Sequence, residues 1–435
     1  MTPDSHLSPA LWEEHGLPQS RLRLLHLSDI HFTAFDGRSN IDLEHAVRAR
    51  MLDDIRYLRA TIGPMDAILV VGDVAARGKD AEYQVAASFL EEVCAAVGVS
   101  PARVACVPGN HDIDRSALGP LHAAVRHQLR GIDPLAISDT LQAIVLDDLG
   151  STVLFRPLAS YNTFALRYGC DISQEKLLWA PKILPFGQRE LRISGITSAW
   201  ICDQQDSDKR DSDRIVAGLF QVASAGEGPN AISLILCHHP LHWLRDGELI
   251  RPWLARAHVV LTGHEHAAGI EVSEDGRSVV VASGAVNPSR TDAGWIPAYN
   301  VIEITEAPAN GVTVTIHTRI WQAKRTGRAE FGPADERPYS LSLELAGGSS
   351  PMPTPPDQAT AGPRVEPTPP EPMQSQDREL LYAIMASPPD RRRSVARRLD
   401  LLSDAVMGLE ADRELLSRAL ASGRLTELKE QIENR

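Results

Sequence analysis

Several features that define other protein classes are scarce or missing in this sequence. The chain has only five cysteines among its 435 residues, and no two of them form a C-x-x-C pair. Most lie in apolar segments, so we expect buried, reduced thiols rather than a disulfide framework. This pattern is typical of a cytoplasmic protein.

Long apolar runs are also missing. No run approaches the roughly 20 residues that a membrane-spanning helix needs. Residues 1–20 contain acids and prolines but no apolar core, so we expect a lead segment rather than a secretory signal. We therefore predict a cytoplasmic location and no membrane partner.

The sequence has fewer basic residues than acidic ones. The chain has 44 Lys and Arg residues against 57 Asp and Glu residues, which gives a formal net charge of -13 at pH 7. This balance argues against a uniformly basic nucleic-acid-binding protein. It does not exclude an anionic substrate, because cations bound by the acidic side chains would neutralise part of the charge.

The composition changes along the chain in a way that predicts two units joined by a linker. Hydrophobic residues form 43% of the chain, which is ample for a large core. Residues 347–376 are dominated by Pro, Thr, Gly and Glu and predict an extended linker. In residues 377–435, apolar residues recur at helical spacing between charged ones. Since so small a unit is marginal alone, we expect it to self-associate or to dock onto a protein partner.

Five short polar blocks each follow an apolar run that has the character of a buried strand. The runs span residues 24–27, 67–71, 104–107, 232–237 and 259–262. The blocks that follow them are Asp29-Ile30-His31, Gly72-Asp73, Gly109-Asn110-His111-Asp112, His238-His239-Pro240 and Gly263-His264-Glu265-His266. Because ligands bind at the carboxyl ends of strands in open α/β sheets, we expect these side chains to converge. Their composition is that of a two-metal centre.

Asp73 is the natural bridge between two cations, because a carboxylate can link ions roughly 3.5–4 Å apart. Asp29 and His31 lie two positions apart, so in an extended segment both side chains can bind one ion. The second ion would take Asn110 and His238, and each ion would take one of the imidazoles His264 and His266. The glycines beside these ligands would permit tight turns or close backbone approach.

In this order, the five blocks resemble the calcineurin-like metallophosphoesterase family, whose pattern is D-x-H, G-D, G-N-H-D/E, H and G-H-x-H. The resemblance covers residues 22–321 approximately and is specific because all five blocks occur together. It implies an α/β four-layer sandwich, in which two facing mixed β-sheets are flanked by helices. It also implies two overlapping ligand sets: Asp29, His31, Asp73 and His266 at one metal, and Asp73, Asn110, His238 and His264 at the other.

Such a centre would hydrolyse phosphoester bonds by in-line attack of a metal-held hydroxide. His111 would protonate the leaving alkoxide, and Asp112 would orient the ring of His111 through a hydrogen bond. For His239 two roles stay open: support of the ligands, or contact with the phosphate. Mixed nitrogen and oxygen ligation suits manganese, iron or zinc, and does not choose among them.

Residues 25–31 and the His-His-Pro block resemble the small-molecule and cyclic-nucleotide phosphodiesterase branch of the family. We therefore favour a phosphodiester substrate, possibly a nucleotide. A DNA or RNA nuclease is the first alternative, and basic grooves would distinguish it. A phosphomonoesterase, including a protein phosphatase, is the next. A phosphoester-binding scaffold that acts through its helical tail is the non-enzymatic alternative, and the intact ligand set argues against it.

The predicted layout has four parts: a lead at residues 1–20, a catalytic domain at 21–346, the linker at 347–376, and a helical adaptor or oligomerisation module at 377–435. Within the catalytic domain, residues 113–190 are expected to form a cap or insertion that selects the substrate. Further helices are predicted at 40–62, 80–97, 118–149 and 215–225, and mixed loop structure at 151–172. Further strands are predicted at 190–198, 278–282, 299–305, 312–321 and 339–345.

Overall fold

The structure is a computed structural model with two compact units, Met1–Pro353 and Thr354–Arg435. It describes residues 20–34, 45–203, 206, 214–223, 231–288, 296–308, 311–323, 329–343, 389–399, 401, 418, 419, 422 and 424–433. The predicted linker and nearly all of the predicted lead lie outside these described residues. Within them, no helix is long and apolar enough to cross a membrane.

The first sheet carries the first three polar blocks. Its strand order is β12-β11-β10-β1-β2-β3, with β13 paired to β11. The strands are β1 (Arg21–Leu27), β2 (Ala67–Val71), β3 (Val104–Val107), β10 (Ala298–Glu306), β11 (Val312–Ala323), β12 (Ala329–Pro333) and β13 (Tyr339–Leu343). β1, β2 and β3 are parallel, and the other strands join antiparallel. The blocks after β1, β2 and β3 therefore meet at one edge of the sheet.

The second sheet carries the last two blocks. Its order is β4-β5-β6-β7-β9-β8. The strands are β4 (Lys182–Phe186), β5 (Arg189–Ile196), β6 (Ala231–Cys237), β7 (Val259–Thr262), β8 (Gly269–Val272) and β9 (Val279–Ala282). β5, β6, β7 and β9 run parallel, while β4 and β8 pair antiparallel at the two edges.

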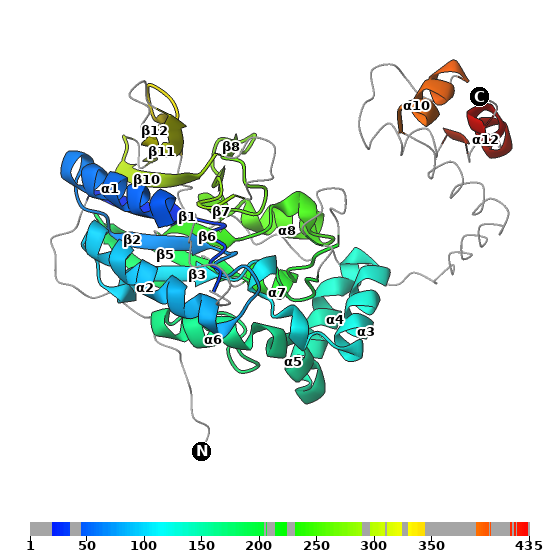
Figure 1. Ribbon diagram of the computed structural model, residues 1–435, viewed down its shortest axis with the longest axis horizontal. Helices are drawn as coiled ribbons and strands as arrows, with labels where there is room; N and C mark the ends of the chain where they lie inside the picture. Colours follow the sequence, from blue (N-terminus) through cyan, green and yellow to red (C-terminus); the bar gives the residue numbers. More distant parts are fainter. Residues whose placement is uncertain are drawn as a thin grey trace. The chain divides into compact units, whose positions relative to one another are not determined.

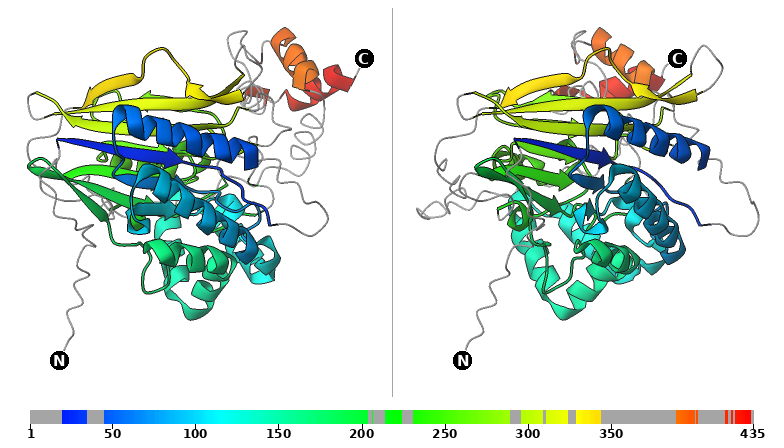
Figure 2. Two further views of the ribbon diagram at one scale, coloured as in Figure 1. Left: turned by 60° about the vertical axis from the view of Figure 1, so that its left-hand side comes forward. Right: turned by 90° about the vertical axis from the view of Figure 1, so that its left-hand side faces the viewer.

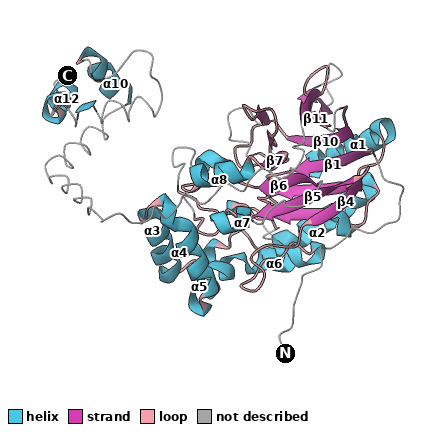
Figure 3. Ribbon diagram, turned by 180° about the vertical axis from the view of Figure 1, so that it is seen from behind, coloured by secondary structure: helices cyan, strands magenta, loops and turns pink. Residues whose placement is uncertain are grey.

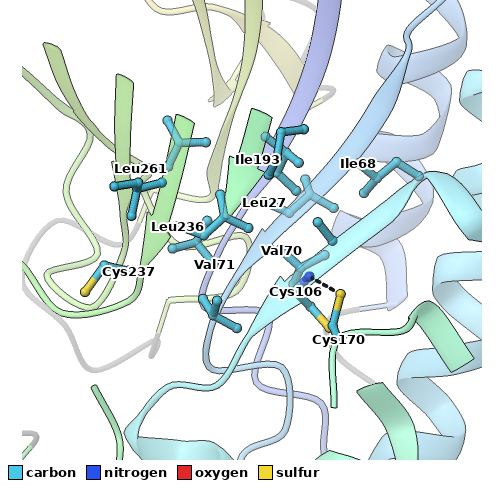
Figure 4. Packing of buried hydrophobic residues seen from close by; sticks show 14 of the residues in the cluster. Leu27, Ile68, Val70, Val71, Cys106, Cys170, Ile193, Leu236, Cys237 and Leu261 are labelled. Atoms are coloured by element: carbon cyan, nitrogen blue, oxygen red, sulfur yellow. Dashed lines mark hydrogen bonds between the residues drawn. The ribbon is translucent and has the colours of Figure 1, made fainter. Parts of the chain in front are cut away.

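The two sheets pack face to face, with β2 and β3 against β5 and β6. Figure 4 shows the core between them, where Leu27 and Val71 from the first sheet and Leu236 and Leu261 from the second are fully buried. Helices α1 (His45–Ile62) and α2 (Asp80–Val97) join β1 to β2 and β2 to β3, and pack against each other (Figures 1 and 2). This confirms the predicted α/β fold of two facing mixed sheets flanked by helices.

A group of helices fills the long interval between β3 and β4. They are α3 (Pro120–Gly131), α4 (Pro134–Leu146), α5 (Asp148–Phe155) and α6 (Ala159–Ala165). The predicted helical stretch 118–149 is broken because Asp133 and Asp147 accept hydrogen bonds from backbone N–H groups just after them and so begin new helices. The prediction of mixed loop structure at 151–172 was wrong, since α5 and α6 occupy much of it.

Helices α3, α4 and α5 lie side by side (Figure 3) and are bound to the segments that follow β5 and β6. Nε of Arg130 donates to the carbonyl oxygen of Arg214 at 2.9 Å. Nη2 of Arg245 donates to the carbonyl oxygen of Ile132 at 2.9 Å. The helices therefore lie at the edge of the second sheet that carries the polar blocks. β4 falls inside the range predicted as an insertion, but it pairs with β5 and belongs to the sheet.

Two shorter helices, α7 (Leu219–Ala223) and α8 (Gly247–Leu254), follow β5 and β6. The helix predicted at 215–225 begins later, because Ile215 forms an isolated bridge with Leu244. Residues 224 and 225 lie outside the described part of the chain.

Helix α1 is fastened to the first sheet by a buried ion pair. The carboxylate of Asp54 accepts from Nε of Arg319 at 2.8 Å and from Nη2 of the same residue at 2.5 Å. The hydroxyl of Tyr299 donates to Oδ2 of Asp54 at 2.5 Å. All three residues are buried, and Arg319 and Tyr299 lie on neighbouring strands β11 and β10.

In the second unit, the structure describes helices α10 (Pro389–Arg398) and α12 (Leu425–Glu433), which pack against each other. Val395, Leu428 and Ile432 are buried. Nη1 of Arg424 donates to the carbonyl oxygen of Leu399 at 2.9 Å. Most of the apolar positions that define the predicted amphipathic pattern, at 380–384 and 402–416, lie outside the described residues, so the module stays a prediction.

Candidate metal centre

Backbone hydrogen bonds join the loops that carry the first two blocks. The N–H of Asp29 donates to the carbonyl oxygen of Gly72 at 3.2 Å, and the N–H of His31 donates to that of Asp73 at 3.0 Å. The last block is joined to the fourth in the same way, since the N–H of Gly263 donates to the carbonyl oxygen of His238 at 2.9 Å. Main-chain bonds therefore join the loops in pairs.

The first predicted ligand set lies together. Nε2 of His266 is 3.4 Å from Oδ1 of Asp29 and 3.4 Å from Nε2 of His31. Nε2 of His31 is 3.9 Å from Oδ1 of Asp29 and 3.9 Å from Oδ2 of Asp73. These spacings allow one cation to contact all four side chains.

The second predicted set lies beside the first. Nε2 of His238 is 3.4 Å from Oδ2 of Asp73 and 3.3 Å from Oδ1 of Asn110. Nδ1 of His264 is 3.1 Å from the same oxygen of Asn110. Oδ2 of Asp73 therefore faces both sets, which is the position that a bridging carboxylate requires.

The donor atoms themselves fit a pair of divalent cations. Oδ2 of Asp29 accepts from the Ser28 hydroxyl at 2.6 Å and from the N–H of His264 at 3.1 Å. Oδ1 of Asp29 is buried and has no hydrogen-bond donor among the described residues. Nδ1 of His238 lies 2.8 Å from the carbonyl oxygen of Val71, so the ring donates there and turns the Nε2 lone pair inward. Such a set suits manganese, iron or zinc.

Five of the predicted ligands have a backbone conformation with a positive φ angle. In the described part of the chain, the non-glycine residues with positive φ are Asp29, His31, Asp73, His264 and His266, with φ between 51° and 71°. Each is a predicted ligand. This conformation is rare for residues with a side chain and costs about 1–3 kcal/mol per residue, and it concentrates at functional sites.

Two motif glycines permit the close packing of the loops. A Cβ atom at Gly109 would collide with Oδ1 of Asp73, and one at Gly263 would collide with the hydroxyl of Ser28. The predicted role of these glycines, close backbone approach, agrees with this geometry.

Charge pairing shapes the acid–base properties of the centre. Burial alone would raise the pKa of Asp73, but the imidazoles of His238 and His111 hold that pKa well below its usual value. For His238, burial lowers the pKa and Asp73 raises it, to about 9. Burial lowers the pKa of His31 to about 4 and that of His264 to about 3. Cation binding at Asp73 would therefore compete with a proton on His238.

His111 lies beside the first ligand set, with its ring centroid 4.6 Å from that of His31. Its Nδ1 is 3.0 Å from the carbonyl oxygen of Ala76, and its N–H donates to Oδ1 of Asp73 at 2.7 Å. The ring is therefore oriented by a backbone carbonyl.

Asp112 does not make the contact with the His111 ring that the sequence predicted. Its carboxylate accepts from the backbone N–H groups of Ala75 at 2.9 Å and Gly109 at 2.9 Å, and from the hydroxyl of Tyr83 at 2.8 Å. Burial, with the nearby charge of Asp73, raises the pKa of Asp112 to about 6. Asp112 thus ties the loop after β3 to the loop after β2, and its influence on His111 is indirect.

Sequence reasoning missed two side chains, Trp243 and Ser198, that contact residues of the polar blocks. Trp243 packs its ring edge against that of His264, with centroids 4.2 Å apart, and donates from Nε1 to Glu265 at 3.2 Å. Ser198 lies 2.7 Å from Nδ1 of His239. Trp243 lies three positions after the His-His-Pro block, and this closeness could have indicated its place at the centre. Nothing in the sequence singles out Ser198.

Similarity to known proteins covers the residues that form this centre. The family model described as calcineurin-like phosphoesterase matches residues 22–268, which is more than half of the chain. An uncharacterized metallophosphoesterase-like protein of Bacillus subtilis (strain 168) is 35% identical over 95 residues, 22% of this chain and 18% of that protein. A cAMP/cGMP dual specificity phosphodiesterase of Mycobacterium tuberculosis is 33% identical over 132 residues, 30% of this chain and 39% of that protein. Each match spans less than half of the relative's length.

Matches among solved structures include Vps29 of Chaetomium thermophilum, at 9% identity and a TM-score of 0.30, covering 74% of this chain and 98% of that one. Sulfate thiohydrolase SoxB of Thermus thermophilus matches at 13% identity and a TM-score of 0.33, covering 76% of this chain and 58% of that one.

Proposed function

This chain belongs to the calcineurin-like phosphoesterase family, and from that premise we propose that it hydrolyses phosphodiesters at a dinuclear metal centre. The observation that carries the proposal is the position of Asp73, whose Oδ2 atom faces both donor sets. The partial similarity to a cAMP/cGMP phosphodiesterase supports a diester substrate, and a nucleotide in particular.

In this proposal, Asp29, His31, Asp73 and His266 hold one divalent cation, and Asp73, Asn110, His238 and His264 hold the other. When bound, the cations would activate water for in-line attack and neutralise charge on the phosphoryl group. His111 supplies the proton to the leaving alkoxide from Nε2, because its Nδ1 is occupied by the carbonyl of Ala76. Asp112 binds the loop after β2 to the loop after β3 and so positions His111.

The proposal is tested by an assay of bis(p-nitrophenyl) phosphate against p-nitrophenyl phosphate with added manganese, zinc or iron, together with the metal content of the protein. Metal-dependent turnover of the diester supports a phosphodiesterase. Preference for the monoester would instead identify a phosphatase. Two bound metals without turnover of either compound would favour a binding role.

Replacing His111 with alanine is expected to slow substrates unequally. Removal of a general acid reduces rates by roughly 10²–10⁴-fold where the leaving group needs a proton. A cyclic nucleotide, which releases an alkoxide, should therefore lose far more kcat than bis(p-nitrophenyl) phosphate, which releases an activated phenolate. Equal losses on the two substrates would contradict the acid role of His111.

We also propose that residues 21–346 form the catalytic domain and that residues 377–435 form an adaptor or oligomerisation module. A chain that ends before Gly347 is expected to keep its kcat and metal content, because the described metal centre draws all its side chains from residues before 270. Its oligomeric state or partner binding should change, as light scattering would show. Loss of folding in this shorter chain would contradict the division.

The cysteines support a reducing compartment such as the cytoplasm. All five are free and buried, so none contributes a disulfide to the fold. We also propose that the predicted insertion at residues 113–190 caps this centre through α3, α4 and α5. The hydrogen bonds that join Arg130 to Arg214 and Arg245 to Ile132 support this proposal.

A further inference from the structure

His239 is a fully buried imidazole beside the metal centre that the proposed mechanism does not use. Only 1% of its surface is exposed. Its ring centroid is 4.7 Å from that of His238 and 4.5 Å from that of His264. One ring nitrogen from each of these three residues lies within 4.8 Å of the others. His239 therefore borders the second donor set directly.

The two ring nitrogens of His239 differ in their surroundings. Nδ1 lies 2.7 Å from the hydroxyl oxygen of Ser198, which is also buried. Nε2 is buried as well, yet among the described residues no atom forms a hydrogen bond with it. A buried polar atom without a partner is unfavourable by about 1–3 kcal/mol, so a native structure usually provides it with one.

The contact with Ser198 is compatible with a ring proton on Nε2. The hydroxyl oxygen of Ser198 accepts the backbone N–H of His239 at 3.5 Å, and its own proton can be donated to Nδ1 along the shorter contact. A ring that accepts at Nδ1 must carry its proton at Nε2. Nε2 is then a donor, and the partner that it lacks is an acceptor.

We propose that His239, held by Ser198, donates from Nε2 to a phosphoryl oxygen of the substrate at the second donor set. The inference rests on the proposed phosphoesterase function and adds a substrate-binding residue to it. An N–H donor at this position would contribute to the affinity for any phosphoryl group and would orient it for attack.

The competing role for His239 is that of an additional metal ligand, which would require a free lone pair on Nε2 rather than a proton. The two roles differ in what a substitution removes. Loss of a donor weakens phosphate binding and leaves the metal content unchanged, whereas loss of a ligand reduces the metal content itself.

The test compares the metal-loaded full chain with H239N, H239Q and S198A. Asparagine places its amide near the position of Nδ1, and glutamine places its amide near that of Nε2. H127N is a matched control, because His127 is exposed on α3. Calorimetric titration with inorganic phosphate gives the Kd, and elemental analysis gives the number of metal ions per chain.

We expect two metal ions per chain in every variant. The Kd for phosphate should rise about tenfold or more in H239N, as expected for loss of a hydrogen bond to a charged group. It should rise less in H239Q and S198A, and stay unchanged in H127N. Full metal content also shows that the variants are folded.

An unchanged Kd in H239N with two metals bound would overturn the proposal, and so would loss of a metal ion from H239N. Wild-type protein that binds no metal, or that binds metal but no phosphate, would instead overturn the proposed function on which the inference rests.

Discussion

An Asp73→Asn variant is expected to lose about 10³-fold or more of kcat/KM toward bis(p-nitrophenyl) phosphate, since metal catalysis supplies several kcal/mol and each 1.36 kcal/mol is a factor of ten. Asparagine keeps the shape of the side chain but not its charge. Oδ2 of Asp73 lies 3.4 Å from His238 and 3.9 Å from His31, so it is the negative charge that both cations would share. The metal content should fall below two ions per chain.

Asp53→Asn is the matched control for this experiment. Asp53 lies on α1 with an exposed side chain and pairs only with arginines of its own helix in the contacts that the structure describes. The activity and metal content of the Asp53→Asn variant should equal those of the wild type. If Asp73→Asn retained two metals and the wild-type rate, the assignment of Asp73 as the bridge would be wrong.

The second large effect is expected in stability. Asp54→Ala should lower the free energy of unfolding by about 3–5 kcal/mol, because removing one partner of a buried ion pair leaves the other charge uncompensated. Here the uncompensated charge is the guanidinium of Arg319, and the hydroxyl of Tyr299 loses its acceptor as well. Urea denaturation followed by circular dichroism measures the change.

Two comparisons make this result specific. Asp53→Ala, one position earlier on α1, should change the free energy of unfolding by less than about 1 kcal/mol, as for other exposed ion pairs. Replacing Asp54, Tyr299 and Arg319 together with Leu, Phe and Met should restore much of the stability, since apolar residues of similar volume can replace a buried ion pair. A small loss in Asp54→Ala would show that the ion pair contributes little to holding α1 on the sheet.

The strands that carry the polar blocks could be predicted because they are buried on both faces. β2 and β3 match the predicted ranges 67–71 and 104–107, and β7 matches 259–262. Continuous apolar runs of this kind are typical of central parallel strands. Helix α2 also matches its prediction at 80–97, since its apolar residues keep helical spacing and Gly98 ends it with a φ of 84°.

The elements that the sequence did not reveal depend on distant parts of the chain. β8 exposes most of its residues and exists because it pairs with β9, so its own pattern gives little signal. α8 contains Pro252, which normally argues against a helix.

For the candidate site, the sequence predicts which side chains gather but not the contacts that they make with distant segments. The convergence of Asp29, Asp73 and His238 follows from their places at the ends of buried strands. The partners of Asp112 did not follow, because the hydroxyl of Tyr83 and the N–H of Ala75 reach it only through the packing of α2 and the loop after β2. Sequence spacing indicates which side chains gather, but not which hydrogen bonds each one makes.

Two kinds of hydrogen bond hold the loops of the centre together. Backbone bonds connect Asp29 and His31 to the loop after β2 and would survive an exchange of side chains. The bonds that the carboxylates of Asp29 and Asp73 accept from the backbone N–H groups of His264 and His111 would not survive it. Redesign of this centre for another ion should therefore keep a hydrogen-bond acceptor at positions 29 and 73, and coordination preference can decide the remaining ligands.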